Sequence, residues 1–113
     1  MRSALVSLMA ALKDHTVTFT QVIEFIENYY QHQPTAFKNG NVYNDKSQNQ
    51  GSAKVFAFAQ INELTEEDTF YLFAEHYQAV LAEPNGADHQ NIRQFMKNGW
   101  RGIDFEGQAL LEK

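Results

Sequence analysis

Apolar residues recur at helical spacing through most of this chain. At its start, Leu5, Leu8, Met9 and Leu12 stand at positions i, i+3, i+4 and i+7, which is the period of an amphipathic helix. The same spacing, with the capping and breaking residues that bound it, predicts five helices: Ser3–Lys13, Thr20 to before Pro34, Ala53–Leu64, Thr65 to before Pro84, and Asp88 to Asn98. Thr20, Thr65 and Asp88 are the expected N-caps of the second, fourth and fifth helices.

The segment Ala53–Leu64 differs from the other four because it is apolar on nearly every side. Only Lys54 and Gln60 interrupt its run of Val, Phe, Ala and Ile. Such a run is either a central helix or a buried strand, and its period alone does not separate the two. The alanine content and the start at Gly51-Ser52 favour a helix.

Two stretches have the pattern of strands. In Ala36–Tyr43 the pair Asn39-Gly40 lies between apolar residues, and this is the typical signal of a β-hairpin. Near the end of the chain, Ile103–Phe105 alternates apolar and polar residues. These stretches predict a small antiparallel hairpin or sheet beside the helices.

The whole pattern predicts a single α+β domain over residues 1–113. It is mainly helical, with about five helices around the central apolar helix Ala53–Leu64. Hydrophobic residues make up 43% of the chain and phenylalanine occurs nine times, which is enough for a core without covalent cross-links.

Composition excludes several classes of protein. The chain has no cysteine, which excludes disulfides, thiolate metal sites and a cysteine nucleophile. Its net charge is −5 and its nine Lys and Arg residues are scattered, which argues against nucleic acid as a partner. No apolar run approaches the roughly 18–20 residues of a membrane-spanning helix. We expect no membrane segment, no metal and no obligate cofactor.

The acidic residues are concentrated in the segment 61–87, which contains no base. Six acids occur there: Glu63, Glu66, Glu67, Asp68, Glu75 and Glu83. They form either a solvated helix face or a docking surface for a basic protein partner. Both interpretations stay open at the level of sequence.

A first polar cluster leads into the central helix. The candidate ligand-binding residues in it are Asn39, Asn41, Asn44, Asn49, Ser52 and Lys54. The N-terminus of a helix offers free N–H donors and partial positive charge, and a lysine adds a formal one, so this segment could hold a carboxylate or a phosphate. The alternative is structural, because asparagine adopts left-handed turns and satisfies the backbone of a loop that enters a buried helix.

A second polar cluster begins the fifth helix and contains Asp88, His89 and Arg93. Asp88 suits a cap, and His89 could act as a general acid or base. No known catalytic motif is present, and the four histidines have no metal-ligand spacing. If the two clusters meet in the fold, they form one polar pocket. A structure that places Ser52 and His89 on opposite faces would exclude it.

Three stretches of the chain carry a family pattern: PTAFKNGNVYN, NQGSAKVFAFAQINEL and HYQAVLAEPNGADHQNIRQFMKNGWRGIDFEGQAL. Together they resemble the HopJ family of bacterial type III effector proteins. The resemblance covers roughly the last three-quarters of the chain. It implies a bacterial protein of the cytoplasm, or one secreted into a host cell by a type III system, and it supplies no catalytic residues.

The leading functional hypothesis is a non-enzymatic interaction protein that binds an unidentified protein partner. The first alternative is a module that binds a small anionic or polar ligand at the asparagine-rich loop before the central helix. The second is a hydrolase-like enzyme with His89 as general base.

Overall fold

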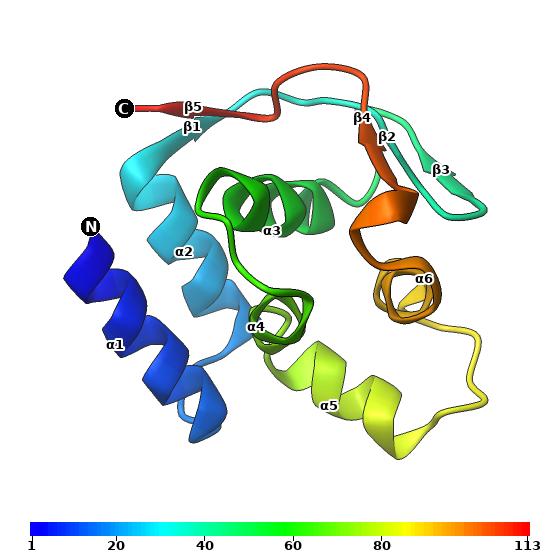
Figure 1. The fold of residues 1–113 in the computed structure, drawn as a ribbon, viewed down its shortest axis with the longest axis horizontal. Helices are drawn as coiled ribbons and strands as arrows, with labels where there is room; N and C mark the ends of the chain where they lie inside the picture. Colours follow the sequence, from blue (N-terminus) through cyan, green and yellow to red (C-terminus); the bar gives the residue numbers. More distant parts are fainter.

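The computed structural model describes residues 1–113 and confirms an α+β, mainly helical fold (Figure 1). The helices are α1 (Arg2–Lys13), α2 (Phe19–Tyr29), α3 (Gln50–Ile61), α4 (Glu66–Tyr71), α5 (Glu75–Ala82), α6 (Gln90–Asn98) and the short 3-10 helix η1 (Gly99–Gly102). The strands are β1 (Tyr30–His32), β2 (Phe37–Asn39), β3 (Val42–Asn44), β4 (Ile103–Phe105) and β5 (Leu110–Glu112). None of the helices combines the length and apolar character that crossing a bilayer requires.

The predicted central helix is confirmed as α3, which begins at Gln50 and ends at Ile61. In Figure 1 it lies between α2 on one side and α6 with its strands on the other. Six residues of α3 are buried, and five of them are consecutive: Ala53, Val55, Phe56, Ala57, Phe58 and Ala59. The Phe56 ring packs against the rings of Phe37, Phe73, Phe95 and Trp100. Aromatic packing around α3 therefore forms the centre of the core.

The predicted hairpin is confirmed by a three-stranded antiparallel sheet in which β2 lies between β3 and β4. Asn39 pairs with Val42 of β3 and with Ile103 of β4. Gly40 takes a positive φ of 58° in the turn, a backbone conformation that glycine adopts without strain. In Figure 1 the sheet lies above α6, along its side.

The predicted second helix is shorter than its pattern indicated, and its cap was assigned wrongly. Thr18, not Thr20, is the N-cap, because its hydroxyl accepts the backbone N–H of Gln21 and the Gln21 side chain accepts the N–H of Thr18. The helix ends at Tyr29, before the predicted stop at Pro34. The next residues form β1, which pairs with β5 at the other end of the chain.

The predicted fourth helix is divided into α4 and α5. Thr65 caps α4 as predicted, since its hydroxyl accepts the N–H of Asp68. The helix then breaks at Ala74, whose φ of 51° and ψ of −125° lie outside the helical region. The apolar stripe continues past the break, so the pattern shows one helix where the backbone forms two.

The predicted cap of the fifth helix is also corrected. Helix α6 begins at Gln90, and His89 occupies the N-cap position with a left-handed φ of 49° and ψ of 47°. The Asp88 carboxylate does not cap the helix; it accepts a hydrogen bond from Arg93 at 2.7 Å.

Candidate functional site

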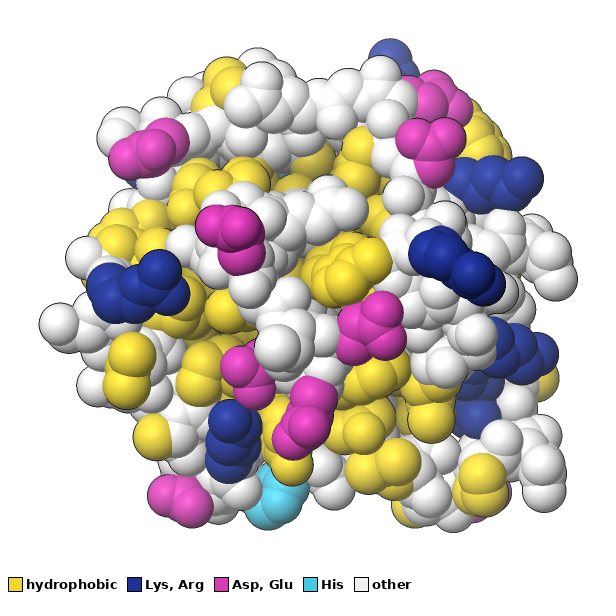
Figure 2. Space-filling model, viewed as in Figure 1, with side chains coloured by type: hydrophobic (Ala, Val, Ile, Leu, Met, Phe, Trp, Pro, Cys, Tyr) yellow, Lys and Arg dark blue, Asp and Glu magenta, His cyan; other side chains and the backbone are white.

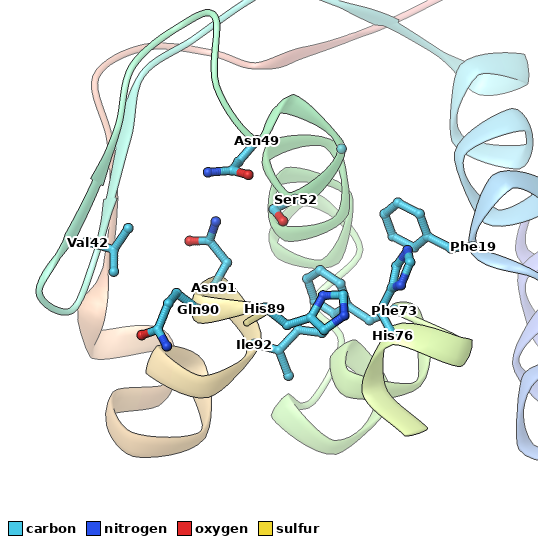
Figure 3. Close-up of a pocket in the computed structure, with 11 residues that line it drawn as sticks. Phe19, Val42, Asn49, Ser52, Phe73, His76, His89, Gln90, Asn91 and Ile92 are labelled. Atoms are coloured by element: carbon cyan, nitrogen blue, oxygen red, sulfur yellow. The ribbon is translucent and has the colours of Figure 1, made fainter. Parts of the chain in front are cut away.

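A cleft of about 390 Å³ opens where four helices begin (Figure 3). Its walls come from the first turns of α2, α3, α5 and α6, with the hairpin residue Val42 at one side. We call it the four-helix cleft. Ser52 and His89 both line it, so the two polar clusters meet. The cleft therefore joins segments that lie far apart in the sequence.

Helix α3 presents an uncapped N-terminus to the cleft. Asn49 precedes the helix with a left-handed φ of 52° and makes no side-chain cap hydrogen bond. Its amide Nδ2 instead donates to Asn44 Oδ1 at 2.7 Å. Gly51 and Ser52, in the first turn, line the cleft. The first N–H groups of α3 are consequently left without a capping side chain, and they carry the positive end of the helix dipole.

Helix α6 repeats this arrangement on the facing wall. His89 precedes it in the left-handed region and provides no side-chain cap. Gln90 and Asn91, in the first turn, line the cleft. By contrast, the N-terminus of α2 is occupied, because the N–H of Phe19 donates to Glu75 Oε1 at 2.7 Å. Helix α5 also lacks a capping side chain, but the N–H groups of His76 and Tyr77 in its first turn donate to the carbonyls of Phe73 and Ala74. The open N-termini at the cleft are therefore those of α3 and α6.

A row of aromatic rings forms another wall. His89 packs against His76 with ring centroids 4.9 Å apart, and His76 packs against Phe19 at 4.8 Å. Phe19 in turn stacks on Phe73 at 6.0 Å and 7°. Figure 3 shows the two imidazoles as neighbours, with Phe19 next to His76. The wall thus combines two imidazole rings with apolar surface.

Behind the cleft lies a buried network of asparagines. Asn91 Oδ1 accepts from Asn39 Nδ2 at 3.0 Å and from Asn44 Nδ2 at 3.2 Å, and Asn91 Nδ2 donates to Asn44 Oδ1 at 3.0 Å. Asn39 Nδ2 also donates to the Asn91 carbonyl at 2.8 Å. Asn39 and Asn44 are fully buried and do not line the cleft. Their contacts hold the hairpin against the start of α6.

The other candidate residues lie elsewhere. Lys54 forms an ion pair with Glu27 at 2.8 Å and does not reach the cleft. Asn41 is exposed in the turn of the hairpin, near the opposite end of α6. The cleft therefore has no formal cation among its lining residues, and any positive potential there comes from helix N-termini and imidazoles.

Arg93 organises the loop between α5 and α6. Its side chain is buried and donates to the carbonyls of Glu83, Pro84 and Asp88, and to the Asp88 carboxylate. The hydrogen bond from Arg93 holds the pKa of the Asp88 carboxyl below its ordinary value. Asp88 Oδ2 also lies 3.9 Å from His89 Nε2. These contacts fix the loop that presents His89 to the cleft.

Of the predicted residues, the structure brings Asn49, Ser52 and His89 to one cleft. His76 was not among the predicted ligand-binding residues, although a histidine three residues after Phe73, on an otherwise apolar stripe, was a usable signal. No group of three or more His, Asp or Glu side chains is positioned to hold a metal ion. The polar groups of the cleft are amides, a hydroxyl, imidazoles and backbone N–H donors, a set suited to an anion.

Comparison with known proteins identifies the family. A solved structure described as unknown function protein VPA0580 is 43% identical to this chain, with a TM-score of 0.88, over 96% of this chain and 93% of that one. A search of curated proteins gave no match. The family model of the HopJ type III effector protein matches residues 5–110, nearly the whole chain. The chain therefore belongs to the HopJ type III effector protein family.

Proposed function

We propose that this protein is a binding domain whose four-helix cleft holds a small organic anion. The observation that carries the proposal is the meeting of two uncapped helix N-termini, those of α3 and α6, with the His76–His89 pair at one cleft. Helix N-termini and protonated imidazoles both attract negative charge, and free N–H groups supply directed hydrogen bonds to an oxyanion.

The lining of the cleft narrows the class of ligand. Its volume is in the range of small-ligand sites. Phe19, Phe73 and Ile92 give it apolar surface, while Asn49, Ser52 and Asn91 surround the open N-termini. A ligand with a carboxylate and an apolar or aromatic body matches both the polar and the apolar part of the lining. The carboxylate would face the N-termini of α3 and α6, and the body would lie along the row of aromatic rings.

Binding of a benzoate probe tests this proposal. Benzoate should raise the melting temperature of the wild-type protein by mass action. The variant His89→Asn removes the imidazole while keeping a residue that tolerates the left-handed backbone, and it should abolish the rise. His15→Asn is the matched control, because His15 also has a left-handed φ, of 59°, and lies outside the cleft.

The control separates binding in the cleft from a general effect of the substitution. His15→Asn should respond to benzoate like the wild type. An equal response in all three proteins would place the ligand elsewhere. If neither benzoate nor a panel of aliphatic carboxylates changes the melting temperature of the wild type, the proposal is wrong.

A second candidate function is the docking of a basic protein partner on the acidic helices, by an effector delivered into a host cell. Membership of the HopJ family favours it. Three of the six acids already have internal contacts: Glu66 accepts the N–H of Trp100, Glu75 that of Phe19, and Asp68 pairs with Lys13. The exposed acids left for a partner are Glu63, Glu67 and Glu83.

Charge reversal tests this second candidate. Glu67→Lys with Glu83→Lys should abolish retention of a partner in pull-down experiments. Glu24→Lys with Glu112→Lys, two exposed acids outside the segment 61–87, is the matched control. Equal retention by both double variants would exclude the acidic helices as the docking surface.

The hydrolase hypothesis stays a prediction. The 3.9 Å approach of Asp88 to His89 could orient a general base, and Ser52 lines the same cleft. An ester hydrolysed by the wild type, and not by His89→Asn at an unchanged melting temperature, would favour an enzyme over a binding domain.

A further inference from the structure

A second cavity lies at the other end of α6, between the turn of the hairpin and η1. Its volume is about 500 Å³, and no hydrophobic residue lines it. Lys38 of β2, Lys97 of α6 and Arg101 of η1 converge on it. We call it the basic pocket. Figure 2 shows Lys and Arg side chains grouped at the right of the view, the side on which α6 and the hairpin lie in Figure 1.

The three cations of the basic pocket have no ion-pair partner in the protein. Lys13, Lys54 and Arg93 each pair with a carboxylate, whereas Lys38, Lys97 and Arg101 do not. Asp104 is the acid that lines the pocket, so three cations and one carboxylate leave two formal positive charges. A protein with a net charge of −5 thus has a local positive site.

Gln94 also lines the basic pocket, and its amide N–H group has no acceptor in the protein. The residue is only 6% exposed. Its Oε1 accepts the backbone N–H of Asn41 at 3.2 Å and the amide of Asn98 at 3.3 Å. Because a backbone N–H can only donate, these bonds fix which end of the Gln94 amide is oxygen. The Nε2 group therefore faces away from them, and the protein provides no acceptor for it.

Two glycines let the elements around the pocket approach one another closely. A Cβ at Gly40 would collide with Gln94 Oε1 and Asn98 Nδ2, and a Cβ at Gly102 would lie 2.8 Å from the Asn98 Cβ. The N–H of Gly40 donates to the carbonyl of Gly102 at 3.0 Å, which ties the hairpin turn to η1. The pocket is thus a fixed hollow lined by three cations and by Gln94, whose Nε2 makes no hydrogen bond within the protein.

We propose that the basic pocket binds a phosphate group. Two excess positive charges match a phosphate monoester, and the unpaired Nε2 of Gln94 can donate to one of its oxygens. The absence of apolar lining excludes the amphipathic carboxylate proposed for the four-helix cleft. Lys97 also interacts favourably with the C-terminal dipole of α6. The helix dipole gives a structural reason for the position of Lys97. It gives none for Lys38 and Arg101, which belong to other elements.

Titration with inorganic phosphate, followed by NMR on the full chain at low ionic strength, tests the proposal. The side-chain amide resonance of Gln94 Nε2 should shift on addition of phosphate. In the triple variant Lys38→Gln, Lys97→Gln, Arg101→Gln, the affinity for phosphate should fall by about tenfold or more, because the three positive charges that line the pocket are removed. Glycerol phosphate, used in parallel, distinguishes a monoester from free phosphate as the preferred ligand.

A matched control removes the same charge elsewhere. Arg2, Lys46 and Lys113 are likewise without ion pairs and lie outside the basic pocket. The triple variant Arg2→Gln, Lys46→Gln, Lys113→Gln should keep the wild-type affinity within about twofold, since distant exposed charges are screened. Equal losses in both triple variants, no shift of the Gln94 resonance, or no binding of either phosphate compound would overturn the proposal. His89→Asn should leave phosphate binding unchanged, which keeps this site separate from the four-helix cleft.

Discussion

Replacing Asn91 by alanine should be one of the most destabilising polar substitutions in this protein. Asn91 is 6% exposed, and its side chain makes three hydrogen bonds to the fully buried Asn39 and Asn44. Alanine removes all three and leaves the hairpin without its polar contacts to the start of α6.

The magnitude follows from what each partner retains. Asn39 Nδ2 keeps its bond to the Asn91 carbonyl, and Asn44 Nδ2 keeps a longer one, of 3.4 Å, to the Phe37 carbonyl. Asn44 Oδ1 keeps the bond from Asn49. No partner is left wholly unpaired, so each lost bond costs about 1 kcal/mol and the sum is about 3 kcal/mol. For a domain of this size, such a loss lowers the melting temperature by roughly 10 °C.

Urea denaturation followed by circular dichroism measures the effect. The midpoint should fall while the slope m stays constant, because the substitution changes stability and not the surface exposed on unfolding. Asn41→Ala is the matched control: Asn41 belongs to the same hairpin, is exposed, and makes no side-chain hydrogen bond within the protein. Its effect should stay within about 0.5 kcal/mol.

A double-mutant cycle provides the sharper test. Asn91→Ala and Asn44→Ala remove two hydrogen bonds in common. The stability lost in the double variant should therefore be smaller than the sum of the two single losses, by about 1 kcal/mol or more. Additive losses would show that the two amides act independently. A cost below about 1 kcal/mol for Asn91→Ala alone would refute the idea that this network holds the hairpin.

Two further substitutions and one titration test other parts of the fold. Phe56→Ala should cost about 4 kcal/mol in urea denaturation, because it leaves a cavity among four aromatic rings; a cost below about 2 kcal/mol would mean that the core collapses into the space. Gly99→Ala should lower the melting temperature, since Gly99 has a φ of 60° and ψ of −154° and a Cβ there would collide with the Glu66 carboxylate; an unchanged melting temperature would contradict the stated strain. The pKa of Asp88 is lowered by its hydrogen bond from Arg93, so its contribution to stability is present above the ordinary pKa of 3.8 and is lost as pH falls through the lower folded-state value. A carboxyl titration by NMR should give a midpoint for Asp88 below 3.8, and an ordinary midpoint would show that the Arg93 contact is absent in solution.

The central helix could be predicted because its composition favoured a helix, whereas the period of its apolar residues fits both a helix and a buried strand. A run that is apolar on all sides fits a helix or a strand, but alanines and the Gly51-Ser52 start favour a helix, and α3 is one. The hairpin could be predicted from Asn39-Gly40. Its turn lies one residue further on, at Gly40 and Asn41, because Asn39 still pairs with Val42.

The break between α4 and α5 could not be predicted in the same way. No glycine or proline marks it, and the apolar stripe runs through it at helical spacing. The turn at Ala74 is held by packing, as Phe73 contacts both Phe56 of α3 and Phe19 of α2. The pairing of β1 with β5 could not be predicted either, because β1 lies in the stretch predicted as the end of the second helix and its partner strand is far away in the sequence.

The candidate site was predicted in part, and backbone geometry explains the rest. Lys54 lies two residues after Ser52, and residues at i and i+2 of a helix do not share a face, so Lys54 turns toward Glu27. Arg93 lies four residues after His89 and would share its face within one helix. His89 is left-handed and stands outside α6, so the arginine points to the loop instead.

Three of the five non-glycine residues with positive φ, namely Asn49, Ala74 and His89, immediately precede the helices α3, α5 and α6 that begin at the cleft. Natural proteins keep such unfavourable conformations mostly where activity needs them. Ala74→Gly and His89→Gly should raise the melting temperature, because glycine adopts a positive φ without backbone strain. The same substitutions would make the orientation of the helix N-termini at the cleft less rigid. The melting temperature should therefore rise while the affinity for the ligand falls.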